Sequence, residues 1–475
     1  MNDGNAVLRV IQDLRRLVAA ADPGTRLPSV RELTARHQAS PVTVAEAVRQ
    51  LVAQGLVETR PGRGTFVAAP PHERRAPDLS WQTVALGPRR TGEEEMQALL
   101  ALPPAGAIPL SGGYLDTDLQ PAAALGAALA RAARQPASWQ RGPTEGREDL
   151  RAWFAREAGA GLRADDMVIC PGGQAALSTA LRALAAPGDT LLVESPTYLG
   201  ALATARAAGL RVVPVPADND GVRPDHLAAA FARTGARLFY CQPLHANPHG
   251  ATLAEHRRAP VADAVREAGA FLIEDDYARD LTLDGQAPPP LAADDPDGHV
   301  IYLRSLTKST APGLRVAAIG ARGPAGARLR AGRLLDDFFV AGPLQQATLE
   351  FVTAPAWARH CRTLRTALRA RREALRDALR RHVPDLAGQP VPRGGMHLWV
   401  RLPDGVDDVA LAAAAVAEGV VVFPGRPWYA AEPPAAHLRL TYAAAPADLM
   451  DEAARRLARA LRSTSVSARS RRAEH

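Results

Sequence analysis

Lysine limits the chemistry of this chain more than any other residue type. The 475 residues hold 57 Lys and Arg against 50 Asp and Glu, a net charge of +7, but Lys308 is the single lysine among them. Any reaction that needs a side-chain amine must therefore use position 308. Thr307 stands before it where a Walker A loop requires glycine, and no second lysine is present to complete a penicillin-binding type of site.

Lys308 is suited to holding an aldehyde cofactor. It follows the apolar run 300–303, so its amine should project from the end of a strand or from the next loop. An amine can form an imine, whereas the guanidinium of arginine stays protonated. Pyridoxal phosphate needs such a lysine, an acid beside the pyridine nitrogen, polar groups at the ring hydroxyl, an aromatic on the ring face and a phosphate cup. An ordinary surface lysine is the alternative.

A run of acidic residues offers a partner for a pyridine nitrogen. Glu274, Asp275, Asp276 and Tyr277 directly follow the apolar run 271–273, at the carboxyl end of a predicted strand, where open α/β sheets bind ligands. Asp275 could keep the pyridine nitrogen protonated, and Tyr277 could hydrogen-bond the ring hydroxyl. By itself the motif is also compatible with magnesium binding or with a solvated turn.

Other motifs could complete the same site. Gly172-Gly173-Gln174 precedes a predicted helix, and a glycine turn there presents backbone N–H groups to a phosphate. Tyr198, in a segment with Pro196, is a candidate for stacking on the cofactor ring. Asn247 is a candidate partner for the ring oxygen.

The motifs fall in a long α/β segment. Between residues 105 and 462, helical patterns alternate with short apolar runs, which predicts a largely parallel central sheet; these runs are 190–193, 212–215, 237–240, 271–273 and 300–303. Residues 70–104 are rich in proline and charge and predict a linker with at most one short helix. Residues 463–475 are rich in Ser and Arg and predict a disordered tail.

The first segment, 5–69, has a different organisation. Three short helical patterns precede two strand-like runs around a glycine-rich tip, 60–64, which is the layout of a winged helix-turn-helix. Hydroxyl and guanidinium groups at the ends of these elements are candidate DNA contacts: Arg31, Ser40, Thr43, Arg49, Arg60 and Arg63. A small helical protein-binding module is the alternative.

Composition adds weaker constraints. The pI of about 9.8 is poor evidence for nucleic-acid binding, because arginine is spread through the whole chain. The first residues lack the basic and apolar regions of a secretion signal, and no apolar stretch is long enough to span a membrane. Three scattered cysteines show neither a disulfide nor a zinc pattern. We therefore expect a soluble, cytoplasmic protein without a bound metal.

Four motifs in the first segment point to a known family. In chain order they are Leu27-Pro28-Ser29-Val30-Arg31-Glu32-Leu33, Ser40-x-x-Thr43-Val44, Leu51-x-x-x-Gly55 and Gly62-Arg63-Gly64-Thr65-Phe66-Val67. They resemble the GntR family of bacterial repressor domains, which implies a DNA-binding function. An arginine often stands in that family where this chain has Pro41, so the base contacts can differ.

The long segment resembles fold-type I aminotransferases in Gly172-Gly173-Gln174, Asn247-Pro248-x-Gly250, Asp275-x-Tyr277, Ser305-x-Thr307-Lys308, Arg315, Gly394-Gly395-Met396-His397 and Arg439-Leu440-Thr441-Tyr442. The resemblance implies a large α/β domain with a mixed, mostly parallel sheet and a small C-terminal α+β subdomain. It also implies roles for individual residues: Lys308 as the imine, Asp275 at the pyridine nitrogen, Asn247 and Tyr277 at the ring hydroxyl, Tyr198 on the ring face, Gly173, Gln174, Ser305, Thr307 and Arg315 at the phosphate, and Arg439 at a substrate carboxylate.

The order of the two parts resembles the MocR family of transcriptional regulators. This resemblance implies pyridoxal phosphate as cofactor, operator DNA as partner, a small amino compound or pyridoxal phosphate itself as the sensed ligand, and a head-to-tail homodimer. Two departures are His249, where threonine is usual, and Arg141-Gly142-Pro143, where Tyr-Gly-Asp-Pro is usual and the tyrosine reaches the neighbouring subunit's phosphate. A true aminotransferase with an ancillary helical domain, and an inactive aminotransferase fold used only for dimerisation, are the competing hypotheses.

Overall fold

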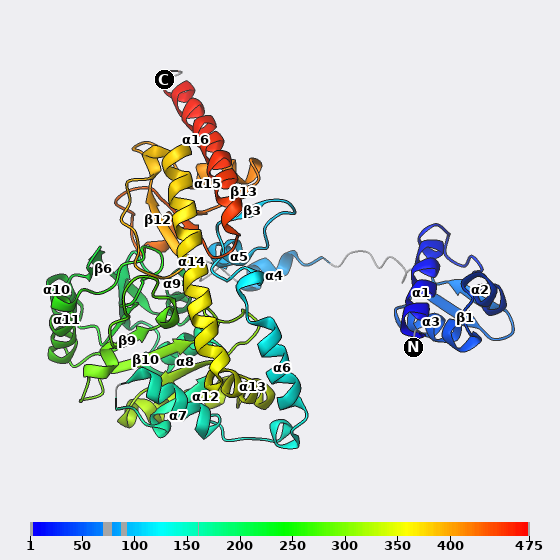
Figure 1. The fold of residues 1–475 in the computed structure, drawn as a ribbon, viewed down its shortest axis with the longest axis horizontal. Coiled ribbons are helices and arrows are strands. Elements are labelled where there is room, and N and C mark those ends of the chain that lie inside the picture. Colours follow the sequence, from blue (N-terminus) through cyan, green and yellow to red (C-terminus); the bar gives the residue numbers. More distant parts are fainter. Residues whose placement is uncertain (1–2, 70–77, 87–92, 160, 474–475) are drawn as a thin grey trace. The chain divides into compact units, whose positions relative to one another are not determined.

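The chain folds into two compact units. The computed structural model describes residues 3–69, 78–86, 93–159 and 161–473, and the units comprise Met1–Arg89 and Arg90–His475. Each unit has its own hydrophobic core, and Figure 1 shows the helices and strands of each.

The first unit is a winged helix-turn-helix. Its elements are α1 (Asp3–Ala19), α2 (Val30–His37), α3 (Pro41–Ala53), β1 (Val57–Arg60), β2 (Gly64–Val67) and α4 (Ser80–Leu86). Strands β1 and β2 pair antiparallel, with Val57 opposite Val67. The apolar residues at helical spacing form the core, since Leu14, Leu33 and Leu51 from the three helices are all buried. This arrangement confirms the predicted fold of the segment.

The second unit is built on an eight-stranded sheet with the order β4-β11-β10-β9-β8-β5-β6-β7. The strands are β4 (Met167–Cys170), β5 (Thr190–Ser195), β6 (Arg211–Asp218), β7 (Gly221–Val222), β8 (Leu238–Cys241), β9 (Phe271–Asp275), β10 (Val300–Ser305) and β11 (Ala317–Gly320). Strands β6, β5, β8, β9 and β10 run parallel, and β11 runs antiparallel to both β10 and β4. The predicted mixed, mostly parallel sheet is confirmed.

Alternating side chains of these strands build two cores, one on each face. Leu192 of β5 packs in the cluster that holds Leu227 of α10, whereas Val193 packs in the cluster that holds Leu177 of α8. Residues i and i+1 of a strand point to opposite faces, so an apolar run buries both. The helices of this part are α5 (Glu93–Leu100), α6 (Ala122–Ala133), α7 (Glu148–Ala158), α8 (Gly173–Leu184), α9 (Leu199–Ala207), α10 (Pro224–Thr234), α11 (Glu255–Glu267), α12 (Gly323–Asp337) and α13 (Gly342–Thr353).

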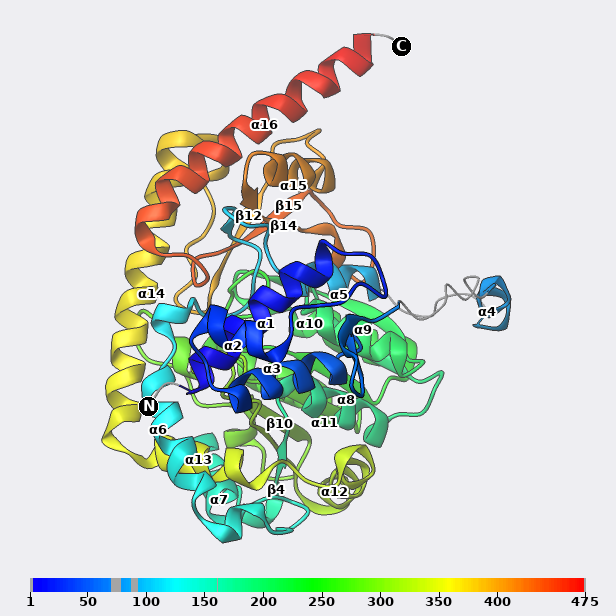
Figure 2. The same ribbon diagram turned by 90° about the vertical axis from the view of Figure 1, so that its right-hand side faces the viewer.

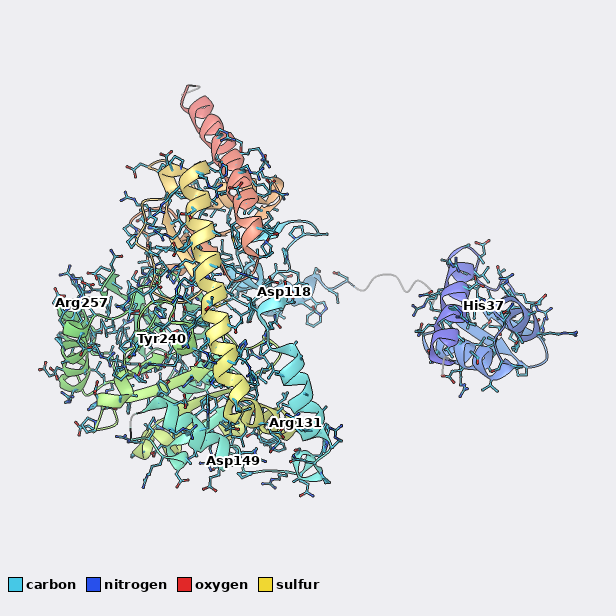
Figure 3. All side chains as sticks on the ribbon, in the orientation of Figure 1. His37, Asp118, Arg131, Asp149, Tyr240 and Arg257 are labelled. Carbon is cyan, nitrogen blue, oxygen red and sulfur yellow. The ribbon has the colours of Figure 1, made fainter. Side chains whose placement is uncertain are left out.

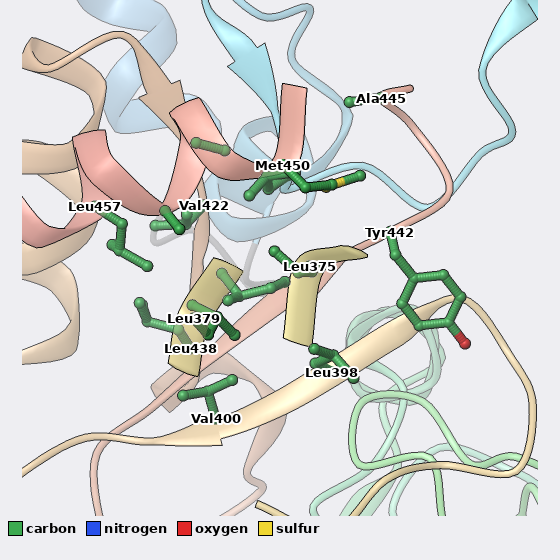
Figure 4. Close-up of a cluster of buried hydrophobic side chains, with 14 of the residues drawn as sticks. Leu375, Leu379, Leu398, Val400, Val422, Leu438, Tyr442, Ala445, Met450 and Leu457 are labelled. Carbon is green, nitrogen blue, oxygen red and sulfur yellow. The ribbon is translucent and has the colours of Figure 1, made fainter. Parts of the chain in front are cut away.

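A smaller α+β subdomain completes the second unit. It contains the antiparallel strands β12 (His397–Arg401), β15 (His437–Thr441) and β14 (Phe423–Pro424), a parallel pair of β13 (Val420–Val421) with β3 (Ile108–Pro109), and the helices α14 (Pro355–His382), α15 (Asp408–Ala417) and α16 (Met450–Ala473). Figure 4 shows its core, where Leu375 and Leu379 of α14 meet Leu398 and Leu438 of the strands. The resemblance predicted this subdomain correctly.

Two segments are more helical than composition suggested. Helix α16 continues to Ala473, although residues 463–475 were expected to be disordered (Figure 2). Its buried first turns, with Met450 and Leu457 in the core, provide a nucleus, and the Ala and Arg that follow are good helix formers. The predicted linker 70–104 holds two helices, α4 and α5, while its residues 70–77 and 87–92 lie outside the described residues.

No helix in the described part of the chain is both long enough and apolar enough to cross a membrane.

Candidate functional site

The ends of the parallel strands bring the predicted cofactor residues together. Residues that follow β4, β5, β8, β9 and β10 reach the same edge of the sheet, because these strands point the same way. One cavity there is lined by every residue that the sequence assigned to cofactor or carboxylate: Gly173, Gln174, Tyr198, Asn247, Asp275, Tyr277, Ser305, Thr307, Lys308, Arg315 and Arg439.

The amine of Lys308 lies in a strongly cationic environment. Its Nζ donates a hydrogen bond to the carbonyl of Gly113 (2.8 Å) and lies 3.9 Å from the ring centre of Tyr114. Burial, with the nearby cations Arg439 and Arg315, lowers the pKa of Lys308 to about 7, and Asp275 acts in the opposite sense. A large fraction of this amine is therefore neutral, and nucleophilic, at neutral pH.

This depressed pKa predicts how the cofactor-free protein captures pyridoxal phosphate. Only the neutral amine attacks the aldehyde, so the capture rate should rise as pH increases through about 7 and level off above it, whereas an ordinary lysine has its midpoint near 10.5. Stopped-flow absorbance between pH 5 and 10 measures the midpoint. In Arg439→Met, which removes a repulsive cation, the midpoint should move upward; a wild-type midpoint near 10 would contradict the prediction.

Asp275 lines the cavity with one carboxylate oxygen already hydrogen-bonded. Its Oδ2 accepts hydrogen bonds from the hydroxyl of Tyr240 (2.6 Å) and from Nε2 of Gln242 (2.8 Å). No described residue donates to Oδ1, which is left for a ring N–H. Burial raises the pKa of Asp275, and the two hydrogen bonds oppose that effect. Tyr240 lies in β8 inside the sheet, in contrast to the peripheral Arg131 and Arg257 (Figure 3).

The turn before α8 has the properties of a phosphate cup. Gly172 has φ +100°, and a Cβ at this position would lie 2.5 Å from the guanidinium of Arg315. A Cβ on Gly173 would lie 3.3 Å from Cβ of Ser305. The hydroxyl of Thr307 is buried without a hydrogen-bond partner in the described structure. Exposed backbone N–H groups, one guanidinium and one unsatisfied hydroxyl fit a phosphate.

Tyr198 is held by residues of two helices, α8 and α9. Its hydroxyl donates to Oε1 of Gln174 (3.0 Å), whose Nε2 donates to Oγ1 of Thr204 (2.5 Å). Gly200 makes room for the ring, because a Cβ there would overlap Cζ of Tyr198. Gln174 thus holds the aromatic side chain in place as well as lining the cavity.

Gly200→Ala should displace Tyr198 and weaken cofactor binding. We expect an overpacking cost of about 1–3 kcal/mol and a loss of stacking worth about 0.5–1.5 kcal/mol, the latter a two- to tenfold weaker affinity for pyridoxal phosphate. Fluorescence titration and thermal unfolding measure the two effects. Gly126→Ala in α6 is the matched control, since a Cβ there meets nothing within 4 Å; equal effects of both variants would refute the steric explanation.

Asn247 and Tyr277 both line the cavity, but their polar atoms are partly committed. The hydroxyl of Tyr277 donates to the carbonyl of His245 (2.7 Å), so toward a ring hydroxyl it can act only as an acceptor. Oδ1 of Asn247 accepts from Arg439 (3.2 Å), which leaves its amide N–H groups as donors for a ring oxygen. A hydrogen bond between Tyr277 and the ring hydroxyl would therefore have Tyr277 as its acceptor.

Arg439 is a buried cation without an acidic partner. It is 1% exposed, and no Asp or Glu of the described residues lies within salt-bridge distance of it. Its guanidinium donates to Asn247 and to the carbonyl of Ser111, and lies 4.3 Å from the ring centre of Trp428. Burial lowers its pKa to about 9. A buried, uncompensated guanidinium is costly, and a ligand carboxylate would satisfy it.

Sequence reasoning missed several lining residues. Tyr114 covers the amine of Lys308, and His397 has a buried Nδ1 without a partner in the described structure. Burial lowers the pKa of His397 well below its ordinary value, so its ring stays neutral. Met96, Leu99 and Leu100 of α5 also line the cavity. The glycines before Tyr114 and before His397 were the only local signals.

The cavity fits pyridoxal phosphate. A nucleophilic amine, a buried carboxylate, a fixed tyrosine and a glycine turn at a helix N-terminus meet in the one cavity. When bound, pyridoxal phosphate supplies an aldehyde that bonds to amines and a ring that withdraws electrons. The chain's own residues hold Lys308 partly neutral and keep Arg439 buried without an acidic partner among the described residues.

The winged helix exposes most of its predicted DNA contacts. Arg31 and Arg63 are exposed, Arg49 is exposed beside Glu46 (2.7 Å), and Arg60 pairs with Glu58 and covers the ring of Phe66 (4.6 Å). Arg31 and Arg63 have no acidic partner among the described residues, so they are the more available cations for phosphate oxygens.

Ser40 and Thr43 have a structural task in this unit. Oγ of Ser40 caps α3 by accepting from the backbone N–H of Thr43 (3.1 Å), and the two hydroxyls share a hydrogen bond (2.8 Å). Thr43 is only 7% exposed. Of the six predicted DNA contacts, it is the one that the structure makes least accessible.

Comparison with known proteins agrees with the division of the chain into a winged helix and a larger α/β unit. Residues 107–457 match the family model "Aminotransferase class I and II", and residues 6–67 match "Bacterial regulatory proteins, gntR family". The HTH-type transcriptional regulator TauR of Rhodobacter capsulatus is 31% identical over 93% of this chain and 93% of its own length. The 2-aminoadipate transaminase of Thermus thermophilus is 32% identical over 81% of this chain and 98% of its own length.

Solved structures show the same fold for the second unit. LysN, the alpha-aminoadipate aminotransferase from Thermus thermophilus, superposes with a TM-score of 0.74 at 30% identity, covering 82% of this chain and 100% of that chain. Fold and site thus define a pyridoxal phosphate-dependent fold-type I aminotransferase domain behind a GntR-type winged helix. The chain belongs to the MocR family of transcriptional regulators, which combine these two domains.

Proposed function

We propose that this protein binds operator DNA through its winged helix and changes that binding when an amino compound occupies the pyridoxal phosphate site. The observation that carries the proposal is Arg439, a buried guanidinium without an acidic partner in the described structure, in the same cavity as Lys308. A ligand amine directed to the cofactor aldehyde that Lys308 would hold, and a ligand carboxylate directed to Arg439, together define an amino acid or a related amino compound as the ligand.

Each site residue has a proposed task. Lys308 holds the cofactor aldehyde, Asp275 the pyridine nitrogen, Asn247 and Tyr277 the ring hydroxyl, and Tyr198 the ring face. Five residues hold the phosphate: Gly173, Gln174, Ser305, Thr307 and Arg315. Arg439 binds the carboxylate of the effector. Arg31, Arg49, Arg60 and Arg63 contact DNA, with Ser40 and Thr43 fixing the start of α3.

Regulation requires that the ligand stabilise one arrangement of the protein over another. We propose a cytoplasmic head-to-tail homodimer, whose two winged helices meet two operator half-sites. Residues 70–104 connect each winged helix to its effector site, so a ligand that changes this connection changes how the half-sites are reached.

Footprinting on the DNA upstream of the gene tests the proposal. The full-length protein is compared with and without pyridoxal phosphate and a panel of amino compounds, and protection should change with at least one of them. Arg63→Ala should weaken protection and reduce the slope of log affinity against log salt concentration by about one, which is the loss of one phosphate contact. Arg401 is an exposed arginine outside the winged helix, so Arg401→Ala should have no effect. A protein that protects no DNA in any condition is not a regulator of this kind.

The second candidate function is transamination, which the complete set of site residues favours. Steady-state turnover with an amino acid and a keto acid at about 1 per second or faster would support it.

A further inference from the structure

Helix α5 forms one wall of the cofactor cavity. Three of its residues, Met96, Leu99 and Leu100, line the same cavity as Lys308 and Arg439. All three are apolar, although α5 begins with a run of three glutamates. Helix α5 lies within residues 70–104, the segment that leads from the winged helix into the second unit.

The same helix contacts residues that stand next to the ligand positions. Met96 and Leu99 pack against the buried cluster of Leu199, Phe423 and Trp428, and α5 contacts α9. Trp428 in turn lies against the guanidinium of Arg439, with 4.3 Å between its ring centre and the guanidinium carbon. The wall made by α5 is therefore continuous with the proposed carboxylate site.

The charges of the described residues that line the cavity are all assigned. They belong to Lys308, Asp275, Arg315 and Arg439, which the proposed function commits to the aldehyde, the pyridine nitrogen, the phosphate and the carboxylate. His397 is neutral because burial lowers its pKa. A second charged group on the effector would lie in this cavity without an opposite charge, which is unfavourable.

We propose that the effector is an amino acid with one carboxylate and an uncharged, apolar side chain that packs on Met96, Leu99 and Leu100 of α5. The inference rests on the proposed function, since it takes the cofactor aldehyde held at Lys308 and the guanidinium of Arg439 as the anchors of the ligand. The side chain then contacts the segment that leads to the winged helix, so its shape and polarity decide how firmly α5 is held.

Isothermal titration calorimetry of the full-length, cofactor-loaded protein tests the ligand class. Leucine, asparagine and aspartate are the probes, because their side chains are similar in shape and differ in polarity and charge. Leucine should bind at least about tenfold more tightly than aspartate, with asparagine between them. Footprinting with the same three compounds, as a second readout, should show the strongest response to leucine.

A charge placed on α5 should reverse this preference. Leu100 lines the cavity and is 56% exposed, so Leu100→Arg can carry its charge without being buried. This variant should bind aspartate more tightly than it binds leucine, and at least about tenfold more tightly than the wild type binds aspartate. Leu102→Arg is the matched control, because Leu102 is 91% exposed and does not line the cavity; its preference should stay that of the wild type.

The outcomes separate this inference from the proposed function. If aspartate binds more tightly than leucine and alters DNA protection, the inference is overturned and the regulator remains. If leucine is preferred and Leu100→Arg reverses the order while DNA protection never changes, the ligand class is supported and the regulatory function is not. If none of the three compounds binds, the inference is overturned.

Leu99→Ala serves as the second variant if Leu100→Arg does not fold. It shortens the apolar wall and removes contacts with the cluster of Trp428, and it should weaken the binding of leucine more than that of asparagine.

Discussion

Lys308→Arg should fold but should lose pyridoxal phosphate during dialysis. Arginine keeps a positive charge at the position, yet its guanidinium cannot bond to the aldehyde, so only the contacts to phosphate and ring remain. We expect the affinity for the cofactor to fall at least about a hundredfold, which corresponds to about 2.8 kcal/mol. Absorbance of the dialysed protein and equilibrium titration measure the loss, and effector-dependent DNA protection should disappear with it.

Two controls make this result specific to the amine. Lys308→Met has nearly the length of lysine without the bulk of arginine, and should lose the cofactor in the same way. In the wild type, borohydride reduction should attach the cofactor to the peptide that contains Lys308, since no other side-chain amine exists in the chain. If Lys308→Arg retained the cofactor as firmly as the wild type does, the imine to the cofactor aldehyde would not be formed at position 308.

Arg439→Met should abolish the response to amino acids while sparing cofactor retention. A hydrogen-bonded carboxylate at a guanidinium contributes about 1.5–3 kcal/mol, so effector binding should weaken about 10- to 150-fold. The stability of the ligand-free variant should be unchanged or higher, because an uncompensated buried charge has been removed. Calorimetry with leucine and denaturant unfolding measure the two effects.

Arg304 provides the matched comparison for stability. It is also buried, at 2% exposed, but it pairs with Asp280 at 2.9 Å. Arg304→Met should cost about 3–5 kcal/mol of unfolding free energy, because it leaves a partly buried carboxylate alone. If Arg439→Met destabilises the protein as much as Arg304→Met does, Arg439 has a structural role that the ligand hypothesis omits.

The cofactor site was predictable because its residues follow short apolar runs. The runs at 271–273 and 300–303 became β9 and β10, and the polar residues directly after them had to meet at one sheet edge. The winged helix was predictable because its helix boundaries depend on residues that are close in sequence. Ser29 and Glu32, for example, form the cap of α2.

The remaining features depend on contacts between distant segments. Nothing in residues 93–100 predicts that Leu99 packs in the cluster of Trp428, or that Tyr114 covers Lys308. The hydroxyl of Tyr277 turns to the carbonyl of His245 because of how the loop after β8 folds. The tail 463–473 is helical because α16 begins in a packed core, which its own composition does not reveal.

The stacking of Trp428 on Arg439 gives the protein an internal optical probe. Indole emission depends on the field and the contacts around the ring, and this buried ring lies 4.3 Å from a charge that a ligand carboxylate would neutralise. We therefore expect occupancy of the proposed effector site to change the intrinsic fluorescence of the unlabelled chain. Because Met96 and Leu99 pack in the cluster of this tryptophan, the same signal also records whether α5 is in place.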